Sequence, residues 1–530
     1  MRTKNGEGEK KKMRVEQKSR VKNGVGRMLF VAVSIVLQIV WFMVLVMKLS
    51  SYATWISVLA SLIAFVFALR MFYRKTTGAI KLSWIVVILV FPILGITMYL
   101  LLGRPDGTKK KRKHFEAIAN RMEGMIPQKE ETFAKIEDEN LVVANQMRYI
   151  RDYGKFPVYD NCEVTYYKDA SEGLKAQIEE LKKAEHYIFM EYHAIEQASA
   201  FDELYEVLKE KAAAGVEVRL LYDDIGSSWF ISPDFVKRVE KDGIECRIFN
   251  PMVPAIFLFL NNRDHRKITV IDGKVAFTGG YNLAEEYFNR THPYGYWKDT
   301  GIKVTGEAAR SFVVMFLEMW NFVKHTDPEP QKYLDMISPK EYKALEKKDG
   351  YVVPYADNPL DFERLGENVY LNLIKNATRY IYLVTPYLII TDEMNRELTL
   401  AAKRGVDVRI VTPGIPDKKL TYQVTRSYYA GLVDEGVQVY EYTPGFCHAK
   451  MCVCDDELAT VGTINLDYRS LYHHFENGCL MYQCDAVKAI KEDFLEMFVK
   501  SCNVTEKYKT KPGHMIRIGQ CLLRLIAPLL

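Results

Sequence analysis

The 530-residue chain has little net charge, because 67 Asp and Glu residues nearly balance 72 Lys and Arg residues and leave +5. Residues 1–27 hold ten Lys and Arg against three Glu, a local charge of +7, which leaves −2 for the remainder. A chain without a broad basic surface is not a general nucleic-acid binder, because phosphate neutralisation needs many cationic side chains. We therefore expect no nucleic-acid partner.

Nine cysteines, an odd number, give no sign of a disulfide framework. Cys447, Cys452 and Cys454 lie close to His448 in the sequence, which raises a metal-binding alternative. However, Cys452 and Cys454 occupy alternate positions of a strand-like segment, and free cysteine packs as a small hydrophobe. No cluster of carboxylates suited to a divalent ion is apparent either. We expect no metal and no other cofactor.

Long apolar runs are abundant near the N-terminus. Residues 28–47, 52–71 and 82–102 are each close to the ~20 residues that cross a bilayer as a helix. A cleaved signal peptide does not explain three such runs. We therefore predict N-terminal transmembrane helices and a multi-pass membrane protein. The third run contains Pro92 and Gly95, so it either spans the bilayer or turns back within it.

The rest of the chain has the pattern of a soluble α/β protein. Residues 187–193, 216–222 and 268–271 indicate buried strands, and residues 201–214 between the first two indicate a helix. The last segment is apolar with two arginines, which suits an interfacial helix. The expected parts are a basic tail at 1–27, membrane segments within 28–103, a charged linker at 104–150, a first α/β unit at 151–335, a second at 351–505 and an interfacial helix at 513–530.

An internal duplication is the most informative feature of the sequence. A histidine, a lysine, an aspartate, a glycine and an asparagine recur with identical spacing, and all five pairs are separated by 183 residues. The first set is His265, Lys267, Asp272, Gly279 and Asn282, and the second is His448, Lys450, Asp455, Gly462 and Asn465. The duplication predicts two homologous α/β units whose loops meet at one site.

These residue types suit chemistry at a phosphodiester. Within each motif His and Lys are two residues apart, so on a strand both would point to the same face. Lysine ammonium and asparagine amide groups donate hydrogen bonds that stabilise phosphate oxygens, so Asn282 and Asn465 are candidate phosphate ligands. Of two imidazoles, one can attack phosphorus while the other protonates the leaving alcohol and later deprotonates the incoming one.

Four acidic residues accompany the motifs. Asp299 and Glu476 follow them at similar distances and are candidates to orient the imidazoles, as carboxylates do in catalytic triads. Asp272 and Asp455 complete the motifs and are counted with their catalytic residues. Each also precedes a turn, where an aspartate commonly accepts hydrogen bonds from backbone amides, so a structural role is the alternative.

The paired motifs resemble the phospholipase D superfamily, and the stretches around them are similar to those of bacterial cardiolipin synthases. The similar stretches are HRKITVIDGKVAFTGGYNLAEEY (265–287), YWKDTGIKVTG (296–306) and VGTINLDYRSLYHHFE (461–476). The apolar segment 84–103 is also similar to the membrane segment of that family. Two positions depart from the pattern: Gly280 stands where many superfamily members have serine, and Gly301 where a bulkier residue is more usual.

The resemblance implies a fold, a reaction and a location. The fold would be two phospholipase D-like α/β sandwich units that form one shared active site. The reaction would join two phosphatidylglycerol molecules into cardiolipin and release glycerol through a phospho-histidine, without metal or nucleotide. His265 and His448 would be the nucleophile and acid pair, with His265 favoured as nucleophile. The partners would be phosphatidylglycerol, other anionic lipids and the bilayer of a bacterial cell membrane.

Several alternatives stay open at this point. A phospholipase D-like hydrolase would use the same residues with water as acceptor, and another transferase, such as one that makes phosphatidylserine, would use a different alcohol. A nuclease is disfavoured by the apolar runs and by the slightly negative soluble part. A membrane scaffold that merely keeps the fold is disfavoured because both copies of the motif are intact.

Overall fold

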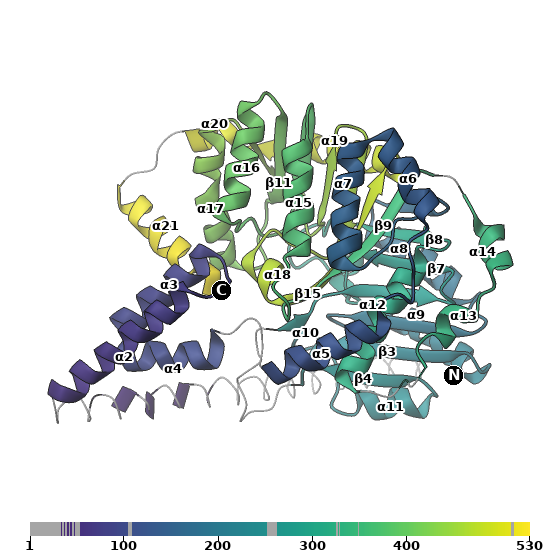
Figure 1. Ribbon diagram of the computed structural model, residues 1–530, viewed down its shortest axis with the longest axis horizontal. Coiled ribbons are helices and arrows are strands. Elements are labelled where there is room, and N and C mark those ends of the chain that lie inside the picture. Colours follow the sequence, from purple (N-terminus) through teal and green to yellow (C-terminus); the bar gives the residue numbers. More distant parts are fainter. Residues whose placement is uncertain are drawn as a thin grey trace, which may run out of the picture.

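The computed structural model describes residues 54–103, 109–251, 262–324, 327, 329–347, 349–509 and 514–529, with scattered positions between 33 and 47. The expected basic tail at 1–27 and most of the first apolar run at 28–47 lie outside these residues. Two α/β units form the main body of the molecule, and a group of apolar helices projects from one end of it (Figure 1).

The first unit is built on a mixed sheet with the strand order β1-β8-β7-β6-β2-β3-β4. Its strands are β1 (Glu163–Tyr167), β2 (Tyr187–Tyr192), β3 (Glu217–Asp223), β4 (Glu245–Phe249), β6 (Lys267–Ile271), β7 (Val275–Gly279) and β8 (Gly301–Thr305). Strands β2, β3 and β4 are parallel, and the other pairs are antiparallel. The strands predicted at 187–193, 216–222 and 268–271 are confirmed as β2, β3 and β6.

The second unit repeats this order as β9-β15-β14-β13-β10-β11-β12, so the internal duplication of the sequence is also a duplication of the fold. Its strands are β9 (Tyr351–Asp357), β10 (Tyr380–Val384), β11 (Asp407–Pro413), β12 (Gln438–Tyr442), β13 (Met451–Cys454), β14 (Leu458–Gly462) and β15 (His474–Tyr482), with β16 (Ser501–Asn503) added beside β12. Strand β13 contains the buried Cys452 and Cys454, which confirms the strand interpretation of these cysteines.

Helices cover the sheets, and most of them leave a polar side in solvent. In the first unit they are α8 (Ala170–Leu181), α9 (Ser199–Ala213), α10 (Asp224–Ser227), α11 (Phe235–Lys241), α12 (Ala309–Val323), α13 (Lys332–Asp335) and α14 (Pro339–Leu345), with the 3-10 helix η2 (Glu285–Phe288). In the second unit they are α15 (Leu365–Asn376), α16 (Asp392–Lys403), α17 (Lys419–Val433), α18 (Tyr468–Tyr472), α19 (Asp485–Val499) and α20 (Thr505–Lys509). The helix predicted at 201–214 is confirmed as α9.

The two units are joined through helices and short strand contacts. Helix α12 contacts β2 and β6 of its own unit and β9 of the second unit, and most of its residues are buried on all sides. Helix α19 correspondingly contacts β1 of the first unit. The two-residue strand β5 (Arg263–Asp264) pairs in parallel with the start of β15. The interface therefore runs directly beside His265, and a parallel bridge between Lys298 and Cys447 brings it beside His448 as well.

The N-terminal apolar segment forms three helices, α2 (Thr54–Phe72), α3 (Gly78–Val90) and α4 (Pro92–Leu102), which contact one another. The third apolar run is thus broken at Phe91, because Pro92 begins a new helix. This break lies beside Pro92, where the sequence allowed the third apolar run to turn back within the bilayer. Within the described residues, no helix combines the length and the hydropathy that a membrane crossing requires.

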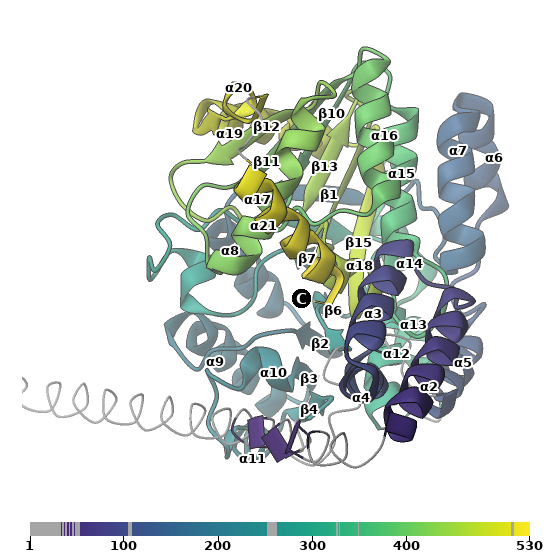
Figure 2. The same ribbon diagram turned by 90° about the vertical axis from the view of Figure 1, so that its left-hand side faces the viewer.

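The predicted linker contains three helices, α5 (Lys109–Met122), α6 (Glu130–Glu139) and α7 (Leu141–Tyr149), followed by the π-helical turn η1 (Ile150–Gly154). Helix α5 packs on α12, and α7 and η1 contact α15. The C-terminal helix α21 (His514–Ile526) and the 3-10 turn η3 (Ala527–Leu529) contact α3, and α21 also contacts α17. Figure 2 shows α21 in front of the two α/β units, with α3 to one side of it.

Candidate active site

Each motif histidine is held by the backbone of the opposite unit. His265 follows β5, and its N–H donates to the carbonyl of Phe475 on β15 at 2.9 Å. His448 is held in the same way, because its N–H donates to the carbonyl of Lys298 at 2.7 Å. His265 lies two residues before β6 and His448 three residues before β13, so neither histidine lies within the strand on which it was predicted. The cross-unit pairing brings both rings to one place.

A carboxylate stands behind each imidazole, and it comes from the opposite unit. Nδ1 of His265 lies 2.9 and 3.0 Å from the two carboxylate oxygens of Glu476. Nδ1 of His448 lies 2.7 Å from Oδ2 of Asp299. Because Nδ1 is engaged in both rings, Nε2 is the nitrogen left for chemistry. Asp299 and Glu476 thus hold the positions expected of orienting residues, and neither unit contains a complete site.

The two carboxylates differ in their surroundings. Glu476 is fully buried and also accepts hydrogen bonds from the hydroxyls of Thr463 and Ser470. Asp299 has no equivalent hydroxyl because Gly280 stands opposite Thr463 in the repeat. A Cβ atom at Gly280 would lie 2.0 Å from Oδ1 of Asp299, so the site has no room for a serine there. The departure of Gly280 from the superfamily pattern therefore has a steric cause.

Gly301, the second departure from the pattern, also has a steric cause. A Cβ atom at this position would lie 2.5 Å from Cε1 of Tyr281, whose ring packs against the start of β8. Tyr281 is itself buried, with 2% of its surface exposed. The ring and the glycine form a close contact two residues after Asp299, which fixes the backbone that carries this carboxylate.

The two motif lysines lie buried behind the histidines. Nζ of Lys267 donates to the carbonyl of His265 at 2.7 Å, and Nζ of Lys450 donates to the carbonyl of His448. Burial lowers the pKa of Lys267 to about 7 and that of Lys450 to about 8, although the nearby Glu476 and Asp299 act in the opposite direction. Two lysines and two carboxylates thus form a compact group of nearly balanced charge.

The surroundings of both imidazoles favour the neutral form of the ring. Burial is the largest cause, and the neighbouring lysines add to it: the pKa of His448 falls to about 3 and that of His265 lies well below its usual value. A neutral imidazole has the lone pair that a nucleophile needs. A bound phosphate would add negative charge between the rings and raise both pKa values, which favours the imidazolium needed for acid catalysis.

The predicted asparagines lie on the pocket wall. Oδ1 of Asn282 accepts from the N–H of Ala194 at 3.1 Å, and its amide donates to the hydroxyl of Tyr287 at 2.8 Å. Asn465 is also buried, and its Oδ1 has no hydrogen-bond partner among the described residues. Both side chains line the same cavity as the histidines. Both asparagines are therefore placed where an amide could contact a ligand in this cavity.

Asp272 and Asp455 do not lie with the other motif residues. Asp272 follows the last residue of β6 with a φ of 52° and accepts hydrogen bonds from the N–H groups of Glu185, His186 and Tyr187, each at 2.8 Å. Asp455 follows the last residue of β13 with a φ of 56° and accepts hydrogen bonds from the N–H groups at 378–380 at 2.7–2.9 Å. Neither lines the cavity. They anchor the starts of β2 and β10, as the structural alternative supposed.

The histidines open into a cavity of about 680 Å³ between the units. Several residues of its lining were not predicted from the sequence. These residues are His193, Arg263, Glu286, Tyr287, Trp297, Tyr387, Asp417, Lys418, Asp467, Arg469 and His474. The sequence contained one signal for two of these residues, which was proximity to a candidate site residue. Arg263 is two residues from His265, and His474 is two residues from Glu476.

The cavity has a basic end around His265. The rings of His193 and His474 lie 5.1 and 5.3 Å from the ring of His265. Arg263 and Arg469 line the same end, and burial lowers the pKa of Arg469. Ligand atoms of His265, His474 and Glu476 lie within 4.8 Å of one another, a spacing that a metal ion could use. The hydrogen bonds of Glu476 described above already account for this grouping.

The other end of the cavity is aromatic. The rings of Tyr287 and Trp297 both lie 5.3 Å from the ring of His448, and the ring of Phe446 lies 5.7 Å from it. Trp297 is 5% exposed, and its Nε1 has no hydrogen-bond partner among the described residues. An apolar wall on this side limits access of water to His448.

Comparison with known proteins agrees with this geometry. The family described as "Cardiolipin synthase, PLD-like domain" matches residues 177–320 and 370–498, one segment in each unit. A second family, described as "Phospholipase_D-nuclease N-terminal", matches residues 59–104. The two matches to one family description correspond to the two halves of the duplication.

Individual relatives extend over most of the chain. A cardiolipin synthase of Geobacillus kaustophilus is 34% identical over 484 residues, which cover 89% of this chain and 93% of the relative. One of Alkalihalophilus pseudofirmus is 32% identical over 482 residues, which cover 90% and 94%. The solved phosphatidylserine synthase of Haemophilus influenzae shares the fold, with a TM-score of 0.53 and 14% identity, over 72% of this chain and 99% of that one. The chain therefore belongs to the family of phospholipase D-like cardiolipin synthases and is an enzyme of the phosphatidyltransferase class.

Proposed function

We propose that the protein makes cardiolipin by transferring a phosphatidyl group from one phosphatidylglycerol molecule to another. The observation that carries the proposal is the pair of histidines in one cavity, each hydrogen-bonded to a carboxylate of the opposite unit. Two such imidazoles are suited to a double displacement at phosphorus, in which one is nucleophile and the other is acid and base in turn.

In the first step, Nε2 of His265 attacks the phosphorus of the donor lipid. The N–P bond forms, the bond from phosphorus to the head-group glycerol breaks, and protonated His448 gives its proton to the departing oxygen. Glu476 stabilises the positive charge that develops on His265, and Asp299 stabilises protonated His448. The products of this step are a phosphatidyl-histidine, neutral His448 and free glycerol.

In the second step, the second phosphatidylglycerol uses a glycerol hydroxyl as acceptor. His448 removes the hydroxyl proton, the oxygen attacks phosphorus, and the N–P bond to His265 breaks. The product is cardiolipin, and His448 again carries the proton that the next turnover needs. Lys267 and Lys450 supply positive charge behind the phosphate, and the amides of Asn282 and Asn465 bind its non-bridging oxygens.

The shape and charge of the cavity support a lipid acceptor over water. A volume of about 680 Å³ exceeds what one phosphodiester and a water molecule occupy. The acceptor carries its own phosphate, and Arg469 at the His265 end is suited to bind it, whereas Arg263 is already paired with the buried carboxylate of Asp223 at 3.2 Å. A hydrolase would need no second phosphate site, so Arg469 favours the transferase.

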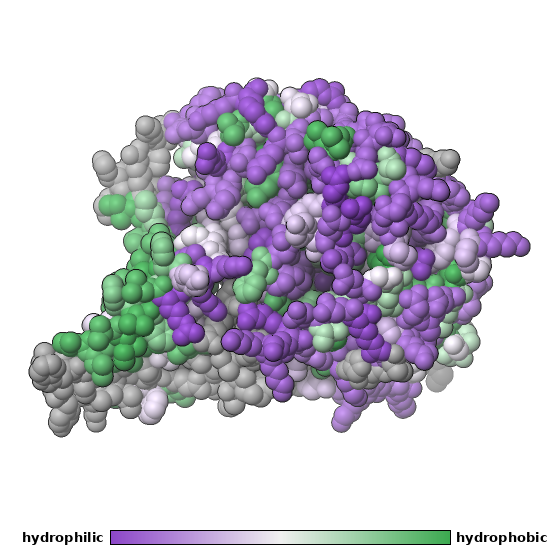
Figure 3. All heavy atoms as spheres, in the orientation of Figure 1, coloured by the Kyte–Doolittle hydropathy of each residue, from purple (hydrophilic) through white to green (hydrophobic). Residues whose placement is uncertain are grey.

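We further propose that the enzyme works at a bacterial cell membrane, with its N-terminal apolar segments inserted and α21 lying at the interface. Exposed apolar side chains on the described helices support this placement, because water-exposed apolar patches mark contact surfaces. They include Leu59, Leu62, Val66 and Leu69 on α2 and Ile518 and Leu522 on α21, each more than half exposed. In Figure 3 the hydrophobic residues gather at this end of the molecule.

A product assay tests the proposed reaction. The purified full-length protein would be given phosphatidylglycerol as sole lipid, beside His265→Ala, His448→Ala and the control His292→Ala, whose ring is exposed and outside the cavity. Cardiolipin and glycerol from the wild type and the control, but from neither active-site variant, is the expected result. Phosphatidic acid with glycerol and no cardiolipin would instead identify a hydrolase.

A further inference from the structure

A small cavity with a basic lining lies where the turn between α2 and α3 meets α5 and the loop before α15. Its volume is about 200 Å³. The charged residues that line it are Arg74, Lys75, Arg112 and Arg364, and none of the described lining residues is acidic. We refer to it as the basic cavity. None of these residues lines the active-site cavity, so a ligand here would not be a reacting substrate.

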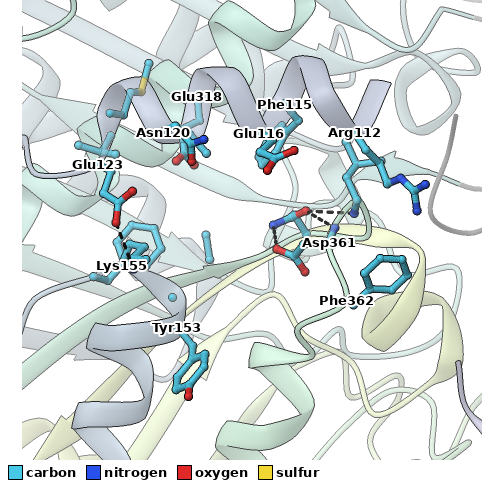
Figure 4. A pocket seen from close by; sticks show the side chains of 18 of the residues that line it. Arg112, Phe115, Glu116, Asn120, Glu123, Tyr153, Lys155, Glu318, Asp361 and Phe362 are labelled. Atoms are coloured by element: carbon cyan, nitrogen blue, oxygen red, sulfur yellow. Dashed lines mark hydrogen bonds and ion pairs between the residues drawn. The ribbon is translucent and has the colours of Figure 1, made fainter. Parts of the chain in front are cut away.

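A larger neighbouring cavity shows that the basic lining is a local property. This cavity, of about 690 Å³, shares Arg112 and Phe362 with the basic cavity. Its lining mixes charges, as Figure 4 shows: Lys155 pairs with Glu123 at 3.1 Å, and further carboxylates stand nearby. Burial raises the pKa of one of them, Glu318, to about 7. An anion would meet these carboxylates in the larger cavity, whereas the described lining of the basic cavity has none.

Two polar groups of the basic cavity lack hydrogen bonds. Nη1 of Arg364 and the hydroxyl of Thr76 are buried and have no partner among the described residues. A buried polar group without a partner destabilises a fold, and native proteins commonly satisfy such groups with a ligand or ordered water. Arg364 packs its guanidinium 4.9 Å from the ring centre of Tyr472, and Arg112 lies 5.4 Å from that of Phe362. Their positions are thus fixed before a ligand arrives.

The basic cavity lies at the end of the exposed apolar surface of α2. Phe72 and Tyr73, which precede the cavity residue Arg74, are 74% and 92% exposed, and Leu69 one turn earlier is 57% exposed. Aromatic side chains followed by basic ones are typical of the boundary between the acyl and head-group regions of a bilayer. A molecule with an apolar chain beside α2 would place its head group at the cavity.

We propose that the basic cavity is a binding site for the phosphate of an anionic phospholipid, separate from the active site. Arginine recognises phosphate through paired, charge-assisted hydrogen bonds, and Lys75 adds a point charge at the rim. The apolar chains of the lipid lie along α2, which gives the lipid an advantage over free phosphate. The bound lipid fixes the turn between α2 and α3 against α5 and the loop before α15.

The test compares two variants of equal charge. Lys75→Gln/Arg112→Gln removes a lysine and an arginine from the cavity. Arg70→Gln/Lys110→Gln removes the same residue types from α2 and α5 at exposed positions that do not line it. Both would be made in a His265→Ala background, so that no lipid is consumed. Native mass spectrometry of the full-length protein, released from nanodiscs of phosphatidylcholine with phosphatidic acid, would count retained anionic lipids.

The cavity variant should retain one anionic lipid fewer than the background protein, with binding weaker by about tenfold, while the matched control retains it. Arg112→Lys, which keeps the charge, should retain most of the binding. Equal lipid retention by both double variants would overturn the proposal. Displacement of the lipid by an equal concentration of inorganic phosphate would also overturn it, because the site would then recognise phosphate without the chains. Thermal melts would confirm that each variant is folded.

Discussion

Replacement of Glu476 by glutamine is the most informative single perturbation of the active site. The carboxylate is fully buried, lies within 3.0 Å of Nδ1 of His265 through both oxygens, and opposes the loss of the proton from Lys267. An amide has the same shape, but it carries no charge. It can also donate to Nδ1, which places the imidazole proton on Nε2 and blocks nucleophilic attack.

The magnitude follows from two contributions. Loss of one charge-assisted hydrogen bond in a buried site costs about 1.5–3 kcal/mol, which is up to about 100-fold because about 1.4 kcal/mol is tenfold. In catalytic triads, the same exchange of acid for amide fixes the wrong tautomer and lowers kcat by about 10⁴-fold. We therefore expect a loss of roughly 10²–10⁴-fold in kcat. Rapid-quench measurement of glycerol release in the first turnover would detect the loss in the step that forms the covalent intermediate.

Glu367→Gln is a matched control for this experiment. Glu367 is 5% exposed and accepts hydrogen bonds from the hydroxyls of Thr391 and Tyr472, each at 2.6 Å, but it does not line the active-site cavity. It should retain nearly full activity even where stability falls. Glycerol release by Glu476→Gln within tenfold of the wild-type rate, with the fold intact, would refute the assignment of Glu476 as the residue that orients His265.

Three further predictions concern other parts of the site. Asp272→Asn should lower the free energy of unfolding by about 1–3 kcal/mol in urea titrations, because the backbone amides at 185–187 lose an acceptor. Its kcat per folded molecule should stay within about threefold of the wild-type value. A large loss of kcat at unchanged stability would contradict the anchoring role. Gly280→Ala should lower kcat by about 100-fold, because the new Cβ displaces Asp299 from His448, whereas Gly431→Ala, which has open space, should be neutral. Finally, kcat/KM should fall as pH rises through about 7–8, because the free enzyme loses the protons of Lys267 and Lys450, whose pKa values are lowered to about 7 and about 8. The value of kcat should stay constant to a higher pH, because bound phosphate raises the pKa of both lysines. A kcat/KM that does not change up to about pH 9 would contradict the conclusion that burial lowers these pKa values.

The repeated elements of the fold and site were predictable from the sequence because they depend on local pattern. The spacing that places His265 and His448 in equivalent positions reflects the same strand and turn in both units. Asp272 and Asp455 precede turns, where a positive φ and nearby amides make an anchoring role predictable as an alternative. Glu476 was identifiable as an orienting residue because it follows its motif as Asp299 does.

The cross-unit arrangement was not predictable from the sequence. That Glu476 binds His265, rather than His448 of its own unit, depends on how the two sheets face each other across β5 and β15. The presence of Arg263 and Arg469 in the cavity lining depends on the same interface. The duplication gave no indication of it, because neither arginine has a counterpart in the repeat. The sequence indicated that the third apolar run could break near Pro92, and the break lies at Phe91. The contacts of α4 with α2 and α3 could not be predicted from the sequence.

Identification of the covalent intermediate tests the central claim most directly. The full-length enzyme would be mixed with phosphatidylglycerol, quenched at alkaline pH, where a phosphoramidate survives, and digested for mass spectrometry. The account predicts a phosphatidyl adduct on the peptide that contains His265, which accumulates in the first turnover and is absent from His265→Ala. An adduct on His448 would reverse the two roles, and cardiolipin formation with inversion at a chiral phosphorus and no adduct would contradict the double displacement itself.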